Sequence, residues 1–552
     1  MKFITPKKIV KSDGIENGSV LLSNKPLQHS YRYDDCAVMK SGGYIILDFG
    51  MEWYGGIAIA NQQVSIHPKS AHLKITFGES VAEVMSNIGE KKSGNYHSMR
   101  DVTLEMCTQS TLKFGATGFR FVRVESLDSE IYIKSIKLCA DFREVAQLGS
   151  FECSDKLLND IWKTGVRTVQ LNMHEYIWDG IKRDQGIFIG DMHPEVATIV
   201  AVFGNDSSIQ KSLDFVRDDT PVGAWMNGIA TYSMWWIIIH YDIFMHYGNI
   251  NYLKEQAECL KDVCNRAIEW VGFNYSGNVR TFVDWSSKGT ISEMQGVKSL
   301  FATGLSKAAK LFDTLNDIEY STKCRKCAKA SCAEKCEVNV NKRIAALNVL
   351  SGRNTNYEIS LLSGNSAAEM SCFMGYYVLL AKAKMGDFSG AIDIIKNYWG
   401  GMLNMGATTF WEDFDMEWME DSARIDEIVP IGKKDIHGEF GRYCYEGFRH
   451  SLCHGWASGP TAFLSKELAG IEILSPGFKK VRINPNIAGL EWFEVNYPTP
   501  FGNINVQTER SGENVRSKIS APPEVELVSA ETCSCSAGNA YTKTMQHRYI
   551  VK

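Results

Sequence analysis

Two segments of this 552-residue chain concentrate carboxylates and aromatic rings in a pattern suited to acid–base chemistry. The first covers residues 178–195, where three glycines within eleven residues disfavour a helix and predict a loop. Its candidate functional residues are Trp178, Asp179, Arg183, Asp184, Phe188 and Asp191. Carboxylates flanked by aromatic side chains are suited to holding a polyhydroxylated molecule, because the rings offer a flat apolar face beside hydrogen-bond acceptors.

The second segment covers residues 406–418 and includes Trp411 and Glu412. It opens the acidic part of the chain: residues 401–450 hold eleven acidic and five basic residues, net −6, whereas the whole chain is −5. Cleavage of a glycosidic bond needs one protonated carboxyl group and one ionised carboxylate across the bond. The two segments could supply such a pair. The alternative is that their carboxylates cap helices or pair with Arg183 and Arg424.

The charge and hydropathy of the chain exclude several classes of partner. A mildly acidic chain is a poor electrostatic match for nucleic acid, and no polybasic segment is present to hold it at an anionic membrane. The longest apolar run, residues 234–239, is too short to span a bilayer. The first residues lack the apolar core of a signal peptide, so we expect a cytoplasmic protein, or a periplasmic one if a signal was trimmed.

The fifteen cysteines are scattered and odd in number, which favours reduced thiols over a disulfide framework. One group, Cys324, Cys327, Cys332 and Cys336, has a spacing that zinc ligands could adopt. The surrounding residues 323–350 are rich in Ala, Lys and Glu, which predicts one long helix, and a straight helix cannot wrap four ligands around one ion. We therefore expect no metal site and no cofactor; a structural calcium ion is not predicted.

The elements that must position the two segments follow from the hydrophobic periodicity. Residues 1–148 alternate apolar and polar positions and predict an antiparallel β-sandwich. Residues 149–468 predict helices joined by long aromatic loops, which suggests a closed α/α barrel with its site at the loop end. Residues 469–552 return to strands and predict a second, smaller β-sandwich. The expected helices cover 207–217, 232–247, 252–271, 296–316, 323–350, 364–385 and 388–399.

At these same segments the sequence resembles the bacterial α-L-rhamnosidases of glycoside hydrolase family 78. The family signature Asp-Cys-Pro-x-Arg-Glu-Arg-x-x-Trp-x-Gly-Asp is matched at Asp179, Arg183, Gly190 and Asp191. The signature Ala-Thr-Thr-x-Trp-Glu is matched by residues 407–412, and a later Ser-x-x-His by residues 451–454. Further likeness at 77–79, 118–124, 476–478 and 481–485 extends the resemblance over nearly the whole chain. It implies a six-hairpin (α/α)6 barrel between two β-sandwiches.

The resemblance also implies an inverting mechanism acting on an oligosaccharide or glycoside. By position, Asp184 would be the general acid and Glu412 the general base. The sugar subsite would be lined by Asp179, Arg183, Asp191, Trp178, Phe188, Asp284, Trp285, Trp411 and His454. A hydrogen-bonded structural histidine is an equally good interpretation of His454. Trp225, Tyr232, Trp235 and Trp236 could form a further stacking platform, although core packing is the favoured reading.

The chain departs from the family at the acid position. Asp184 replaces a glutamate and shortens the side chain by about 1.5 Å, a displacement that can cost on the order of a hundredfold in rate. The Arg-x-x-Trp that follows in the family is replaced here by residues 185–188. Glu175 and Glu195 are nearby alternative acids. Two other functions therefore stay open: a lyase or a glycosidase for another sugar on the same barrel, and a carbohydrate binder without catalysis.

Overall fold

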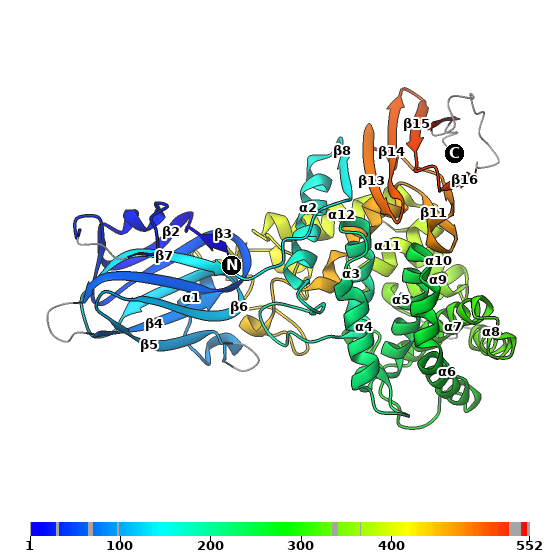
Figure 1. The fold of residues 1–552 in the computed structure, drawn as a ribbon, viewed down its shortest axis with the longest axis horizontal. Helices are drawn as coiled ribbons and strands as arrows, with labels where there is room; N and C mark the ends of the chain where they lie inside the picture. Colours follow the sequence, from blue (N-terminus) through cyan, green and yellow to red (C-terminus); the bar gives the residue numbers. More distant parts are fainter. Residues whose placement is uncertain are drawn as a thin grey trace.

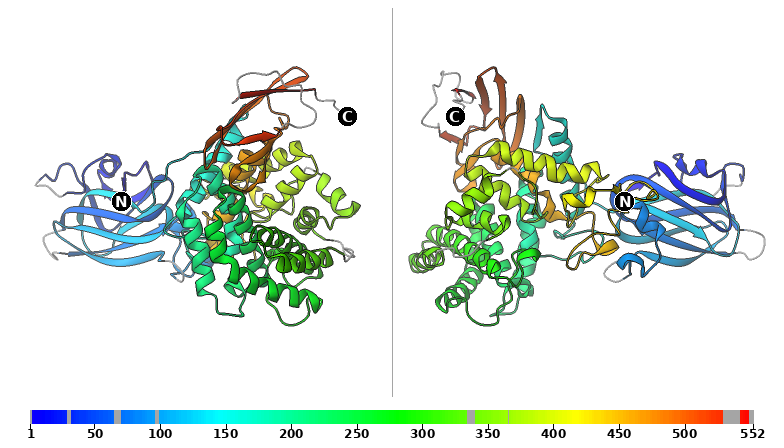
Figure 2. Two further views of the ribbon diagram at one scale, coloured as in Figure 1. Left: turned by 45° about the vertical axis from the view of Figure 1, so that its right-hand side comes forward. Right: turned by 180° about the vertical axis from the view of Figure 1, so that it is seen from behind.

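The computed structural model describes residues 2–28, 32–64, 70–95, 99–333, 340–364, 366–528 and 542–548, the last of these by backbone alone. An N-terminal antiparallel sheet, a central helical domain and C-terminal sheets follow one another along the chain (Figure 1). Turned views show the N-terminal sheet beside one flank of the helices and the C-terminal strands against another part of the same domain (Figure 2). None of the described helices is long and apolar enough to cross a membrane.

Two long strands, β3 (Ala37–Val64) and β6 (Thr111–Ser126), form the spine of the N-terminal domain. Its seven strands pair antiparallel in the order β1-β7-β3-β6-β4-β5, and β2 pairs with β3. The register of β3 shifts after Asp48, next to Gly50 at φ 87°, so the strand bends there. The remaining strands are β1 (Lys2–Ile4), β2 (Lys8–Glu16), β4 (Ser70–Gly78), β5 (Asp101–Cys107) and β7 (Ile131–Ala140).

The central domain is helical, as the periodicity predicts. Its first helix begins after Asp155, whose side chain accepts hydrogen bonds from the backbone N–H groups of Leu157 and Leu158. The helices are α2 (Lys156–Asn172), α3 (Ile189–Val202), α4 (Ser207–Asp219), α5 (Ala230–Tyr247), α6 (Ile250–Gly272), α7 (Ile291–Thr314), α8 (Ile318–Ala333), α9 (Lys342–Ser351), α10 (Asn356–Ser363), α11 (Gly375–Lys384), α12 (Phe388–Asn404) and α13 (Gly459–Ala462).

Three local predictions are wrong. Residues 323–350 are not one helix, because α9 starts anew after Asn341, whose side chain caps it. Cys324, Cys327 and Cys332 lie on α8, and Cys336 lies outside the described residues. Residues 364–385 form a helix only from Gly375. The predicted loop 178–195 ends early, because α3 begins at Ile189. A glycine is required at position 190 of this helix, because a side chain there would collide with the ring of Tyr232.

The core of the helical domain is aromatic. Trp235 and Trp236 on α5 and Trp399 on α12 are fully buried. They therefore pack in the core, in agreement with the favoured interpretation of this aromatic group. Trp225 is partly buried, with the Arg266 guanidinium over its ring.

The C-terminal strands form a five-stranded sheet, β17-β15-β14-β13-β8, and a three-stranded sheet, β11-β12-β16. Strand β8 (Ser150–Cys153) comes from the start of the helical region and pairs antiparallel with β13 (Trp492–Thr499), so the C-terminal sheet is tied to the residues that precede α2. The domain limits 148/149 and 468/469 stay predictions. The other strands are β11 (Ile471–Ser475), β12 (Lys480–Ile483), β14 (Gly502–Ser511), β15 (Asn514–Ser520), β16 (Glu526–Val528) and β17 (Thr542–Arg548).

Candidate active site

A cavity of about 170 Å³ lies where the start of α3 meets the loops between helices. The segments 178–195 and 406–418 meet there, as the sequence predicts. The lining residues are Asp179, Arg183, Asp184, Phe188, Asp191, Ile229, Tyr232, Arg280, Thr281, Phe282, Trp285, Lys288, Glu412, Cys444, Tyr445, Arg449, His454 and Trp456. Carboxylates, cations and aromatic rings thus share one concave surface, as in sites for small polar ligands.

Glu412 is 3% exposed and is fixed by its backbone as well as its side chain. Its N–H donates to the Ser451 carbonyl at 3.0 Å, and the Ser451 N–H donates to its Oε2 at 3.2 Å. The indole N–H of Trp456 donates to the Glu412 carbonyl at 3.0 Å. The Arg183 guanidinium bonds both carboxylate oxygens, with 2.5 Å from Nη2 to Oε1. This carboxylate is therefore preorganised inside the cavity by charge-assisted hydrogen bonds.

Asp184 lies on the other side of the same arginine. Arg183 Nη1 donates to Asp184 Oδ2, while Arg183 Nε donates to the Arg449 carbonyl at 2.9 Å. Asp184 and Gln185 both adopt left-handed φ angles, 61° and 50°, which side chains other than glycine seldom occupy and which often mark functional sites. One guanidinium with a hydrogen bond on each side limits the Asp184 and Glu412 carboxyl groups to a separation of about 8 Å.

A buried hydrogen-bonded group forms the floor of the cavity. Asp179 Oδ1 accepts from the Gly186 N–H at 2.8 Å. Asp191 Oδ1 lies 3.2 Å from His454 Nε2, and Asp191 Oδ2 accepts from the Tyr232 hydroxyl at 3.1 Å. Burial raises the pKa of Asp179 to about 8, so this carboxyl group is protonated at neutral pH. Burial lowers the pKa of His454, but Glu412 and Asp191 outweigh it and raise that pKa.

Glu195 adds a further carboxyl group one helical turn after Asp191. It is 1% exposed, and no described residue makes a hydrogen bond to either of its carboxylate oxygens. Burial, with Asp191 and Asp179 nearby, raises its pKa well above the usual value. Gly455 faces it: a Cβ at that position would lie 1.5 Å from Glu195 Oε1. A glycine is therefore required at 455 while Glu195 keeps this position.

Three predicted sugar contacts lie elsewhere. Trp178 stacks on His174 with ring centroids 3.8 Å apart and does not line the cavity. Trp411 is 1% exposed, in the core beside Glu412. Asp284 lies 3.0 Å from Arg343 Nε, in a small adjoining cavity that also contacts Trp285 and Glu412. Asp179, Arg183, Asp184, Phe188, Asp191, Trp285, Glu412 and His454 do line the main cavity.

Several other lining residues were not among the predicted site residues. Tyr445 accepts a hydrogen bond from the Trp285 indole N–H, and the Arg183 guanidinium lies 5.6 Å from its ring centroid. Arg449 donates from Nε to the Cys444 carbonyl at 2.8 Å. Tyr445 and Arg449 belong to the acidic window 401–450, so that window was a usable signal. Arg280 had no comparable signal.

The N-terminal domain reaches the site through a buried ion cluster. Lys182 Nζ lies 3.2 Å from Glu79 Oε2 and 2.9 Å from Glu83 Oε1, and the Leu452 N–H donates to Glu79 at 2.7 Å. With His437, the two glutamates have a spacing that could hold a metal ion. Because Lys182 pairs with both glutamates and Arg100 Nε lies 3.9 Å from Glu83 Oε1, we assign this cluster to domain attachment: it ties β4 and α1 (Val81–Met85) to the segment that precedes Arg183.

Comparisons with known proteins bear on this geometry. Residues 146–320 match the bacterial alpha-L-rhamnosidase 6 hairpin glycosidase domain, and residues 470–529 match the bacterial alpha-L-rhamnosidase C-terminal domain. A curated alpha-L-rhamnosidase of Formosa agariphila is 20% identical over 463 residues, which are 71% of this chain and 45% of that protein. The crystal structure of a family GH78 rhamnosidase of Bacillus sp. GL1 matches with TM-score 0.73 and 19% identity, over 93% of this chain and 55% of that one.

A rhamnosidase from Klebsiella oxytoca, solved with rhamnose bound, matches with TM-score 0.61 and 19% identity, over 84% of this chain and 94% of that one. The chain spans about half the length of the Formosa and Bacillus relatives. The chain therefore resembles the bacterial α-L-rhamnosidases, and the predicted fold, a six-hairpin helical barrel between antiparallel sheet domains, is confirmed.

Proposed function

We propose that this protein is an inverting glycoside hydrolase of the α-L-rhamnosidase type, which releases terminal α-L-rhamnosyl or related residues from oligosaccharides or glycosides. The matched glycosidase domain and the fold support the class of reaction. The observation that carries the proposal is Glu412, a buried carboxylate held by Arg183 and Ser451, which lines the same cavity as Asp184 and Asp179. Glycoside hydrolysis requires two carboxyl groups that flank the scissile bond.

In this mechanism Glu412 is the general base. It accepts a proton from a water molecule that attacks the anomeric carbon on the face opposite the leaving group. The hydrogen bonds from Arg183 and the Ser451 N–H keep the carboxylate oriented before substrate arrives. The upper limit of about 8 Å on the separation from Asp184 overlaps the lower part of the roughly 6.5–9.5 Å range that leaves room for this water.

The proton donor is Asp184, at the position of the family's acid. Before it can donate, Asp184 must leave its ion pair with Arg183 and take up a proton from solvent, and the left-handed backbone at 184–185 supplies a segment able to change conformation. Asp179 is the second candidate donor, because it lines the same cavity and holds its proton at neutral pH. Asp191 and His454 would accept and donate hydrogen bonds to the sugar hydroxyls, and Trp285 would flank the ring.

A panel of aryl glycosides that includes an aryl α-L-rhamnoside tests the proposal, with Glu412→Gln as the inactive control. Hydrolysis of the rhamnoside, lost in the variant, is expected. Cleavage of another aryl glycoside alone would assign a different sugar. An unsaturated product from a uronic-acid polysaccharide would assign a lyase. Sugar binding without turnover, unchanged in Glu412→Gln, would assign a binding protein.

A further inference from the structure

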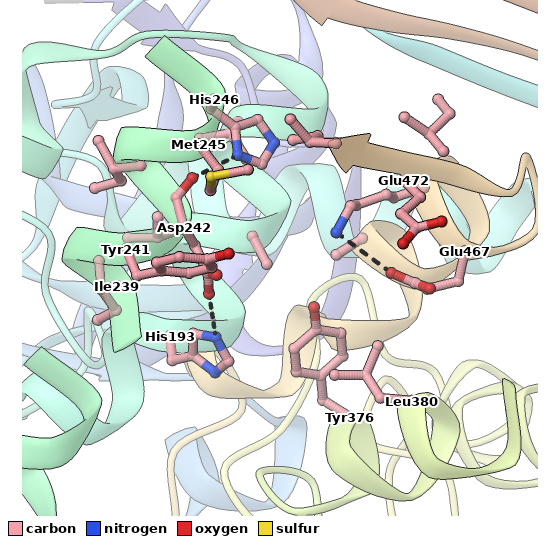
Figure 3. Close-up of a pocket in the computed structure, with 18 of the residues that line it drawn as sticks. His193, Ile239, Tyr241, Asp242, Met245, His246, Tyr376, Leu380, Glu467 and Glu472 are labelled. Carbon is pink, nitrogen blue, oxygen red and sulfur yellow. Dashed lines mark hydrogen bonds and ion pairs between the residues drawn. The ribbon is translucent and has the colours of Figure 1, made fainter. Parts of the chain in front are cut away.

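A second cavity, of about 330 Å³, has nearly twice the volume of the candidate active site. It lies farther along α3, between the helices and strand β11, and shares no lining residue with the first cavity. Figure 3 shows it with His193 and Asp242 on one side and Glu467 and Glu472 on the other. Its volume falls within the range of roughly 300–1,000 Å³ seen for small-molecule sites.

Two helices each present one face to this cavity. On α3 the lining positions are 193, 196, 197 and 200, and on α5 they include 239, 242, 243 and 246. Residues at this i, i+3, i+4, i+7 spacing share one face of a helix. That face normally carries apolar side chains and is buried in a core. Here that face carries His193, Asp242 and His246. The barrel therefore keeps polar groups around a space that ordinary packing would close.

The first wall of the cavity is built around Asp242. Lys307 Nζ lies 2.5 Å from its Oδ1, and His193 Nε2 lies 3.2 Å from its Oδ2. His193 is itself fixed through Nδ1, 2.9 Å from the Tyr377 hydroxyl. The ring of Tyr241 lies beside this group, with Lys307 Nζ 5.1 Å from its centroid. This wall therefore offers a carboxylate, an ammonium group and an aromatic ring.

The second wall comes from the π-helix Phe463–Glu467, a rare element that is frequent at functional sites. Lys466 Nζ lies 3.5 Å from Glu467 Oε1, a loose contact that leaves the ammonium hydrogens available to a ligand. The Tyr376 hydroxyl points into the cavity in Figure 3, and no described residue forms a hydrogen bond with it. This hydroxyl can therefore donate to, or accept from, a ligand in the cavity.

The chemistry of the lining selects a class of ligand. Asp242, Glu467 and Glu472 are hydrogen-bond acceptors, and Lys307, Lys466 and the Tyr376 hydroxyl are donors. Burial lowers the pKa of His193, and it lowers the pKa of His246 to about 4, so both histidines are neutral and the lining is close to neutral overall.

Alternating donors and acceptors match hydroxyl groups, which act as both. An anion would face more carboxylates than ammonium groups, and an apolar ligand would leave the polar groups unpaired. We propose that this cavity binds a neutral polyhydroxylated molecule of monosaccharide size, at a site separate from the catalytic cavity.

Calorimetric titration of the full chain with L-rhamnose and D-glucose tests this, with D-glucuronate and glycine as the anionic and zwitterionic probes. Tyr376→Phe removes one hydroxyl that no described residue binds, and Lys466→Gln removes one ammonium group. Asp191→Asn is the matched variant in the catalytic cavity. Binding of at least one neutral sugar should survive Asp191→Asn and weaken about tenfold in Tyr376→Phe or Lys466→Gln.

Two results would overturn the proposal: loss of all sugar binding in Asp191→Asn with none lost in the other two variants, or binding of glucuronate or glycine in place of both neutral sugars. An unchanged melting temperature for each variant shows that the fold is intact. Because the readout is binding, failure of this proposal is distinguishable from a failure to hydrolyse a rhamnoside.

Discussion

Arg183 donates to both carboxylate oxygens of Glu412, and its other terminal nitrogen donates to Asp184. One guanidinium therefore bridges the proposed base and the proposed acid. Burial opposes the positive charge, but Glu412 and Asp184 outweigh it and raise the pKa of Arg183. The arginine holds the two carboxyl groups at a fixed distance from one another until a substrate displaces one bond.

Replacing Glu412 by Gln should lower kcat for an aryl α-L-rhamnoside by about 10²–10⁴-fold, because the amide cannot accept the proton of the attacking water. KM should change little, since the shape of the cavity is kept. Steady-state kinetics measure both. Glu417→Gln, an exposed acid in the same window, is the control and should keep wild-type rates. Equal rates for Glu412→Gln and wild type would remove Glu412 from the mechanism.

Asp184→Asn and Asp179→Asn separate the two candidate proton donors. Loss of the donor should slow an alkyl rhamnoside by about 10²–10⁴-fold but spare an aryl rhamnoside with an acidic leaving group, which departs without protonation. We expect this leaving-group dependence in Asp184→Asn. If the leaving-group dependence appears in Asp179→Asn instead, Asp179 is the acid. In that case wild-type activity should fall as the pH rises past about 8, and this fall should be absent from Asp179→Asn.

Removal of the Arg183 charge should destabilise the fold. In Arg183→Met the buried Glu412 carboxylate loses its partner, at a cost of about 3–5 kcal/mol in the free energy of unfolding. Arg424→Met is the matched control, because Arg424 is 44% exposed and its pair with Asp426 should contribute about 0–1 kcal/mol. Urea unfolding at pH 7 compares them. Similar losses of unfolding free energy in both variants would show that the bonds of Arg183 to Glu412 and Asp184 do not stabilise the fold more than an exposed ion pair does.

Stability should fall as pH rises, through Asp179. Its folded pKa of about 8 exceeds the unfolded value of about 3.9, so between these pH values the folded chain keeps a proton that the unfolded chain releases. Each pH unit in that window removes about 1.4 kcal/mol for this group. Asp179→Asn, which cannot ionise, should therefore gain in melting temperature over wild type at pH 7.5 more than at pH 4.5. An equal difference at both pH values would refute the assignment.

Gly455→Ala should cost about 1–3 kcal/mol or more, because the new Cβ collides with the Glu195 carboxyl group. Glu195→Ala should relieve that collision, so the double variant should be more stable than the sum of the two single changes predicts. A thermal double-mutant cycle measures this coupling. Additive effects would show that Glu195 does not press on residue 455.

Much of the architecture could be predicted from local pattern. The change from alternating to helical periodicity near residue 149 separates the N-terminal sheet from the helices, and the first helix of the central domain, α2, follows it. The meeting of residues 178–195 and 406–418 is confirmed by the bond between Arg183 and Glu412. The acidic window also proved informative, because it contains Glu412 and lining residues of the cavity.

Other features depend on tertiary packing, which residue types do not encode. Trp178 and Trp411 have the residue type of sugar contacts, but their rings lie against His174 and in the core, respectively. The break between α8 and α9 depends on the Asn341 cap inside an otherwise helical composition. Glu195 became prominent only through its burial beside Gly455.

The central claim is inverting hydrolysis of an α-L-rhamnoside with Glu412 as the base. Proton NMR during the first minutes of turnover of an aryl α-L-rhamnoside tests it most directly, because it identifies the anomer released before mutarotation. We expect β-L-rhamnose as the first product and no product from Glu412→Gln. Initial release of α-L-rhamnose, or no cleavage of the rhamnoside by the wild-type protein, would contradict it.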